Sequence, residues 1–367
     1  MSSLDQQSEV IQLADELGVD WRTQPVNNII RFCQEKLGRW VADAGCVTTI
    51  ADLEQLVCTK LRLIFEEVWV DADLDQIIRK YVARGEPVFA TLRDEFDDQT
   101  FATLIQSRSV APEAPDQYVA IIDCRGPKAT RRFFTRWHEI AHMLTLTRQL
   151  QFHFHRSTSD RCPVEKLMDA IAGEVGFYDP IFAPALNVEA QTGRGLSFEG
   201  VEAIRSRFCS DASLQATLFA AVKRFPTAVV YVEAGLGYKK QEEAMRRSNQ
   251  LDLIPSATPE AKLRVLQVSA NDAARKGGYR IDRNMQVPGG SMLARRFDSK
   301  EDTVSVPVEG VESLDDWRHS DGTPVGTGNI RVEARLQGER VIALIQPTRG
   351  HCEVSGAGHG HDGLTVS

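Results

Sequence analysis

Two histidines that lie four positions apart, with a glutamate between them, are the residues best placed to do chemistry. His138, Glu139 and His142 occur in the stretch RRFFTRWHEIAHML. If this stretch is helical, residues four apart lie on one face, so both imidazoles can reach a single metal ion. Glu139 lies about 100° further round the helix axis, so it borders the same cleft without ligating. The spacing therefore predicts a metal centre with a carboxylate beside it.

The chemistry that this pattern favours is zinc-assisted hydrolysis. Zinc lowers the pKa of a bound water to about 7, so hydroxide is available at neutral pH. A neighbouring carboxylate can take a proton from that water and pass it to a leaving amine. The chain has only eight histidines, so a chance occurrence of the pattern is rare. The alternative is a helix whose histidines simply hydrogen-bond to their neighbours.

A third protein ligand must come from elsewhere in the chain, because a catalytic zinc has three such ligands and one open position. His153 and His155 follow in QFHFHRS, where strand-like alternation sends both side chains to one side. Glu165 begins the next helical pattern and can turn back towards the first helix if the two pack. Asp169 lies one turn on and would suit a supporting role, accepting the spare N–H of a ligating histidine. Physical reasoning alone leaves Glu165, Asp169 and Glu174 open.

The elements around the motif alternate between helical and strand-like patterns. Residues 4–62 carry apolar side chains at helical spacing. Four later runs, LIFEEVWV, EPVFATLR, TFATLIQS and YVAIIDC, are rich in β-branched and aromatic residues and favour strands. Helices are expected over 71–84, over 128–149 around the motif, and over 164–180, the last one stopped by Pro180.

Two further helical patterns within 199–225 are separated by CSD and resemble a helix-turn-helix. A DNA-reading helix needs basic and amide side chains on its exposed face. The second pattern offers few of them: Gln215, Thr217, Lys223 and Arg224. We therefore favour packing or substrate docking for this helix pair over DNA reading.

The domain organisation follows from shifts in composition. We expect a helical N-terminal region over 1–62, a metallopeptidase domain over 63–237, a linker over 238–260 and a β-rich C-terminal domain over 261–348. The metallopeptidase domain includes a strand at TAVVYVEA. The β-rich domain is expected to hold the strands KLRVLQVSA, GYRIDRNMQV, TVSVPVEG, NIRVEARL and ERVIALIQP. The Gly-rich residues 349–367 are expected to be a disordered tail. The predicted fold class is α+β.

Composition excludes several classes of protein. The chain of 367 residues is 42% hydrophobic and 26% charged, the balance of a globular protein. Its net charge of −8 argues against a broad nucleic-acid-binding surface. Seven cysteines with no C-x-x-C pair argue against a disulfide framework or a zinc ribbon. The polar start and the absence of a long apolar run predict no secretory signal and no membrane span, hence a cytoplasmic protein.

The stretch RRFFTRWHEIAHML resembles the Arg-Phe-Thr lead-in to the active-site helix of the ImmA/IrrE family of metallopeptidases. The second motif of that family is a glutamate, an Ala-Asn or Ala-Asp pair three and four residues on, then Phe-Ala, and a Leu-Met-Pro ending. VEKLMDAIAGEVGFYDP matches it in part. The resemblance implies that Glu165 is the third ligand and Asp169 a helper. Met168, Ile171 and the GFYDP ending depart from the pattern, and the likeness covers about residues 60–235.

The resemblance also implies a function and a fold. Members are zincin-like endopeptidases that cut a DNA-binding repressor, usually a helix-turn-helix protein, and so switch on stress, mobile-element or defence genes. By this likeness Zn²⁺ is held by His138, His142 and Glu165, and Glu139 is the catalytic base. A protein substrate is then the expected partner, and direct nucleic-acid binding is not expected. The alternative is a regulatory module that binds DNA or a repressor and whose metal site is structural or inactive.

Overall fold

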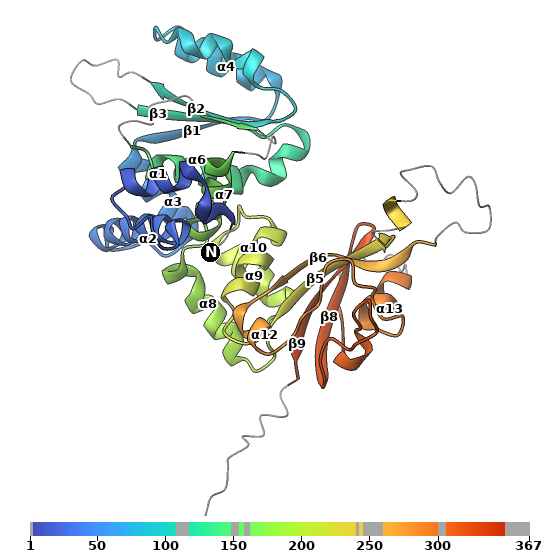
Figure 1. Cartoon of the computed structure of the whole chain (residues 1–367). Helices are drawn as coiled ribbons and strands as arrows, with labels where there is room; N and C mark the ends of the chain where they lie inside the picture. The colour runs from blue at the N-terminus through green and yellow to red at the C-terminus, as the bar shows by residue number, and fades with distance from the viewer. Residues whose placement is uncertain are drawn as a thin grey trace, which may run out of the picture. The chain divides into compact units, whose positions relative to one another are not determined.

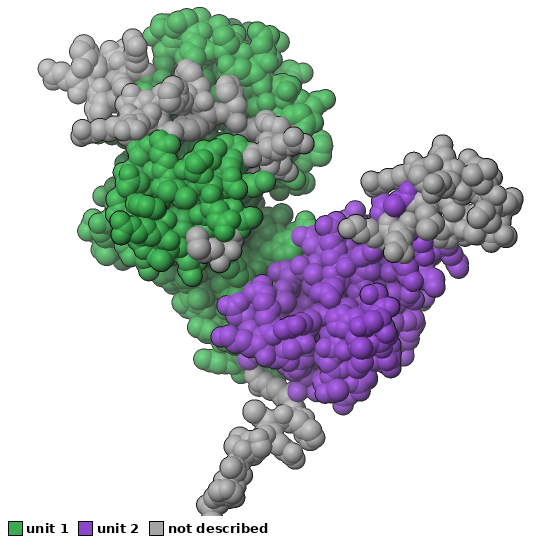
Figure 2. Space-filling model, in the orientation of Figure 1, with its two compact units in different colours: residues 1–226 green, residues 227–367 purple. Residues whose placement is uncertain are grey.

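The computed structural model of the chain describes residues 3–107, 117–147, 154–157, 162–239, 242–244, 260–299 and 306–348. The chain forms two compact units, Met1–Pro226 and Thr227–Ser367 (Figure 2). Each unit contains helices and one sheet (Figure 1). The predicted α+β class is therefore confirmed. Within the described ranges, every helix is too short or too polar to cross a membrane. The six cysteines in these ranges are free thiols.

The N-terminal region is helical, as its apolar spacing predicts. It contains α1 (Ser8–Glu16), α2 (Pro25–Ala44) and α3 (Ile50–Leu61). A capping box starts α3: Thr49 Oγ1 accepts from the Asp52 amide at 3.1 Å, and Asp52 Oδ2 accepts from the Thr49 amide at 2.9 Å. Because α1 and α2 pack against α7 (Pro163–Val175), and α3 against α6 (Arg132–Leu144), these helices belong to the first unit.

The sheet of the first unit has the order β1-β3-β2-β4. Its strands are β1 (Leu63–Val68), β2 (Thr100–Ser107), β3 (Gln117–Asp123) and β4 (Phe154–Ser157). β1 runs parallel to β3, and β2 runs antiparallel to β3 and β4. Three of the four predicted strands in this region are confirmed as β1, β2 and β3.

The fourth run, EPVFATLR, is not a strand, so that prediction is wrong. Its residues form a 3-10 turn (Pro87–Thr91) and the short helix α5 (Leu92–Glu95). Phe89 and Leu92, which are three positions apart, are both fully buried. The Phe89 ring stacks on Tyr81 of α4 (Asp71–Val82), and the two ring centroids are 4.1 Å apart. The apolar spacing is therefore helical, which a run this short did not reveal.

Helices cover both faces of this sheet (Figure 1). Val119 and Ile121 of β3 belong to the core cluster beneath α4. The alternate residues Ala120 and Ile122 are also fully buried, and α6 packs against β2 and β3. Every residue of α6 from Trp137 to Leu144 is buried, so α6 is the central helix of the unit.

The helices after the sheet differ from the prediction at their ends. The motif helix is shorter than 128–149: residues 126–131 form a 3-10 turn before α6. The helix expected over 164–180 ends at Val175, and Pro180 lies in the first turn of α8 (Asp179–Gln191). A proline needs no amide partner there, so it starts a helix instead of stopping one. The predicted helix pair is confirmed as α9 (Phe198–Phe208) and α10 (Leu214–Arg224).

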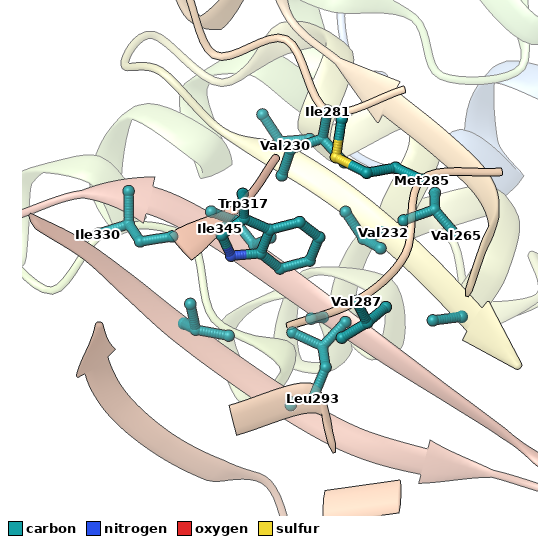
Figure 3. Close-up of a cluster of buried hydrophobic side chains, with 14 of the residues drawn as sticks. Val230, Val232, Val265, Ile281, Met285, Val287, Leu293, Trp317, Ile330 and Ile345 are labelled. Atoms are coloured by element: carbon teal, nitrogen blue, oxygen red, sulfur yellow. The ribbon is translucent and has the colours of Figure 1, made fainter. Parts of the chain in front are cut away.

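The sheet of the second unit is antiparallel throughout, with the order β6-β5-β9-β8-β7. Its strands are β5 (Val230–Gly237), β6 (Lys262–Ala270), β7 (Val308–Ser313), β8 (Asn329–Gln337) and β9 (Arg340–Pro347). Two short helices, α12 (Asp272–Lys276) and α13 (Met292–Asp298), join them. Figure 3 shows the core, in which Val230, Ile345 and Leu293 surround the fully buried Trp317.

Two predictions about this unit are wrong. The strand TAVVYVEA was expected to end the metallopeptidase domain at residue 237, but β5 lies between β6 and β9, so the boundary falls at 226–227. Its apolar residues Val230 and Val232 complete the second core, and local sequence does not reveal which sheet a strand joins. GYRIDRNMQV forms no strand and makes one isolated bridge, Arg264 to Gln286. Most of the expected linker and the whole expected tail lie outside the described residues.

Candidate metal centre

The packing of α6 against α7 brings three predicted ligands together. His138 and His142 lie on α6, and Glu165 lies in the first turn of α7. His138 Nε2 is 3.0 Å from Glu165 Oε2, and His142 Nε2 is 3.4 Å from Glu165 Oε1. The two imidazole Nε2 atoms are 3.2 Å apart. Three donor atoms from two helices thus converge on one point, as a metal site requires.

The spacing of these donors fits a tetrahedral ion. Zinc ligands at about 2.0–2.1 Å from the ion lie roughly 3.3–3.4 Å from one another in a tetrahedron. The observed separations of 3.0, 3.2 and 3.4 Å need only small side-chain shifts to match. Two nitrogens and a carboxylate oxygen are also a donor set that zinc accepts. The residues present therefore fit a zinc ion, with one coordination position left open.

Asp169 sets the orientation of the first histidine. Its Oδ1 atom accepts from His138 Nδ1 at 2.8 Å. With the proton on Nδ1, the neutral ring carries its lone pair on Nε2, the atom that faces Glu165 and His142. Carboxylates commonly fix the tautomer of a metal-binding imidazole through a hydrogen bond of this kind.

Burial and charge prepare Glu165 as an anionic ligand. Its side chain is 28% exposed, and burial acts to raise the pKa of the carboxyl. The close contacts with the imidazoles of His138 and His142 outweigh burial and keep the pKa of Glu165 below its ordinary value. The carboxylate is therefore ionised at neutral pH. The two histidines are only 1% and 4% exposed, so a bound ion would be shielded from bulk water on their side.

Glu139 follows His138 on α6 and is 1% exposed. A helix turns its side chain about 100° away from that of His138. A carboxylate this deeply buried keeps its charge only where a cation or donors stabilise it. A metal ion beside Glu139 would supply such a positive charge. The carboxylate could then stay ionised and accept a proton from water.

The remaining candidate ligands do not join this cluster. Glu174, on the same helix as Glu165, pairs instead with Lys223 and with Arg224, the latter at 2.9 Å, and so links α7 to α10. His153 lies outside the described residues. The backbone of His155 is in β4, opposite Thr103, and its side chain is outside the described part.

A charge network on the other side of α6 was not predicted. Arg136 pairs with Glu54 of α3, and Arg132 pairs with Glu67 of β1 at 2.6 Å. Asp211, in the turn between α9 and α10, lies 3.3 Å from Arg132. Arg136 and His138 are two residues apart, so they face opposite sides of the helix. The network fixes α6 against α3 and β1 and so holds the ligand face in place.

Asp123 anchors the entry to the motif helix. It ends β3, is 2% exposed, and accepts from Arg125 Nη2 and Lys128 Nζ, both at 2.8 Å. Burial acts to raise its pKa, but these bonds outweigh burial and lower it. The stabilisation is therefore complete above the pKa of an unfolded aspartate, about 3.9, and is lost as the pH falls through the lower pKa of the folded state.

We expect Asp123→Asn to lower the free energy of unfolding by about 2 kcal/mol at pH 7, since two charge-assisted bonds are weakened. Urea unfolding of both proteins at several pH values measures this. The difference between them should shrink as the pH falls below about 4. A difference that stays constant with pH would show that the Asp123 charge does not contribute.

Asp169→Ala should weaken zinc binding about 10- to 100-fold, because the imidazole of His138 loses its orienting acceptor. Competition with a fluorescent zinc chelator measures the change. Asp169→Asn is the matched variant, because its amide oxygen can still accept from Nδ1, and it should recover part of the affinity. Equal losses in both variants would mean that the charge of Asp169, and not the hydrogen bond, matters.

In comparisons with known proteins, no protein-family model matches the chain and no curated protein matches it significantly.

Proposed function

We propose that the chain is a zinc-dependent endopeptidase of the zincin-like kind, related to the ImmA/IrrE family. The observation that carries the proposal is the convergence of His138, His142 and Glu165 from two packed helices, with donor separations of 3.0–3.4 Å. The buried glutamate directly after the first histidine supports hydrolysis over a purely structural site. A structural site needs four protein ligands and has no use for that carboxylate.

The bound zinc ion would supply Lewis acidity and make water a nucleophile at neutral pH. His138, His142 and Glu165 would hold the ion, and Asp169 would keep His138 in the ligating tautomer. Glu139 accepts a proton from the attacking water and delivers it to the nitrogen of the leaving amine. The net reaction consumes one water and yields a carboxylate and an amine, so no other reactant is needed.

We propose a protein substrate, and by resemblance a helix-turn-helix repressor whose cleavage releases stress, mobile-element or defence genes. Among the described strands, β4 lies at the edge of its sheet, and this position supports an extended peptide as the substrate conformation. β4 pairs on one side with β2 and ends the sheet. An extended peptide can add to such an edge through main-chain hydrogen bonds.

The helix pair supports the peptidase over a DNA-binding module. Arg205 of α9 pairs with Glu202, and Arg224 of α10 pairs with Glu174 and Asp179. Lys223 also pairs with Glu174. Cations that are already neutralised by carboxylates contribute little to phosphate binding. We therefore assign this pair to packing within the first unit.

The proposal is tested by mapping new protein N-termini in a cell extract incubated with the zinc-loaded protein. We expect a small number of new termini that disappear when a zinc chelator is added and return when excess zinc is restored. Termini that form equally with the chelator would exclude zinc-dependent hydrolysis. DNA binding that falls steeply with salt, with no new termini, would favour the regulatory module instead.

A further inference from the structure

A cavity of about 850 Å³ lies within the second unit, apart from the metal centre. Its walls come from the start of β6, from the irregular segment 282–288 beside that strand, and from the turn 316–322. Segment 282–288 is held to β6 by backbone hydrogen bonds, such as Val287 N to the Leu263 carbonyl at 3.0 Å. The volume is in the range of small-molecule sites.

The side chain that distinguishes this cavity is Arg264 of β6. Arg264 lines the cavity yet is only 4% exposed, so its guanidinium lies deep in the wall. Among the described residues it has one acceptor, the Asn284 carbonyl, 3.0 Å from Nη1. Its Nε atom is buried with no acceptor. No described carboxylate forms an ion pair with it, whereas the partly buried Arg136 and Arg224 of the first unit each have at least two carboxylate partners.

An arginine in this state is costly for the folded protein. Removing a guanidinium from water without an anionic partner makes the folding free energy markedly less favourable. Buried cations are therefore normally paired, and an anion entering the cavity would supply the missing partner. The planar guanidinium offers two parallel N–H donors, which match the oxygens of a carboxylate or a phosphate.

The rim of the cavity is positively charged, as Arg264 is. Lys239, Arg283 and Arg318 are exposed and line it together with Arg264. The described lining contains two carboxylates, and one of them, Asp282, lies 3.3 Å from His319 Nδ1. Four cations thus face two carboxylates in a chain whose net charge is −8. This local positive potential attracts anions.

We propose that the second unit binds a small oxyanion in this cavity, with a carboxylate or phosphate group on the Arg264 guanidinium and the rim cations around the rest of the molecule. Arg264 is too deeply buried for the backbone of a nucleic acid to reach. None of the residues of this site belongs to the metal centre, so this proposal and the peptidase proposal can be tested separately.

The test is isothermal titration calorimetry of the full-length protein with inorganic phosphate and, separately, with succinate. We expect at least one of them to bind, and the anion that binds more tightly tells whether the natural ligand carries phosphate or carboxylate. Arg264→Gln should weaken that binding at least tenfold, which corresponds to about 1.4 kcal/mol. Arg275→Gln removes an exposed arginine elsewhere in the same unit and should leave binding unchanged.

If Arg264→Gln fails to fold, the rim variants Arg283→Gln and Arg318→Gln provide the same test, because both side chains are exposed. Each should weaken binding by about threefold, the loss of one nearby surface charge. Binding weaker than about 10 mM for both anions, or binding that the Arg264 or both rim variants leave unchanged, would overturn the proposal.

Discussion

Glu139→Gln is expected to keep its zinc and to lose peptide hydrolysis by roughly 10²- to 10⁴-fold, the usual contribution of a general acid–base group. Glutamine has nearly the same volume as glutamate, so the fully buried position stays filled. The amide cannot accept the proton of the attacking water, and the proposed ligands His138, His142 and Glu165 are unchanged. Initial rates of cleavage at a site identified in the extract, together with zinc content, measure both halves of this prediction.

The control for this variant is Glu199→Gln, which changes an exposed glutamate of α9 in the same unit. It should retain both zinc and activity. Cleavage by the Glu139 variant at the wild-type rate would remove Glu139 from the mechanism. Loss of zinc together with activity would instead make Glu139 a ligand and would require a different base.

His142→Ala is expected to lower zinc content from about one ion per chain to none. Loss of an orienting contact already costs 10- to 100-fold in affinity, so loss of one of three ligands costs more. Elemental analysis by mass spectrometry of tag-free protein measures this. His351, His359 and His361 should be alanine in every sample, because histidines in the C-terminal segment can bind zinc adventitiously.

Stability gives a second measure of the same variant. An ion that binds only the folded state at a thousand times its Kd adds about 4 kcal/mol to the free energy of unfolding. A chelator should therefore lower the Tm of the wild type and leave that of His142→Ala unchanged. His319→Ala removes a half-buried histidine outside the proposed ligand set, and the chelator should lower its Tm as much as it lowers that of the wild type. Zinc retained in His142→Ala would exclude this centre.

The local pattern around the motif was sufficient to predict that the imidazoles of its two histidines lie close together on one face of a helix. In a helix, residues four apart share a face whatever surrounds them, so the 3.2 Å approach of the His138 and His142 Nε2 atoms follows from the sequence and the helical geometry. The same holds for β2 and β3, whose continuous apolar runs are typical of strands covered on both faces.

The identity of the proposed third ligand could not be predicted in this way. Glu165, Asp169 and Glu174 lie on one helix and have similar chemistry. Which of them approaches the histidines depends on how α7 crosses α6. The structure places Glu165 on the two imidazoles, Asp169 on Nδ1 of His138, and Glu174 on the cations of α10. The family resemblance had implied the first two of these contacts.

Short-range geometry was therefore enough to predict the helical motif, most strands and the α+β class. The tertiary structure was needed to show that β5 joins the second sheet and that EPVFATLR is helical. It also decided that Arg264 is buried without an anionic partner among the described residues. These outcomes depend on contacts between residues far apart in the chain, and a local pattern of residue types contains no information about such contacts.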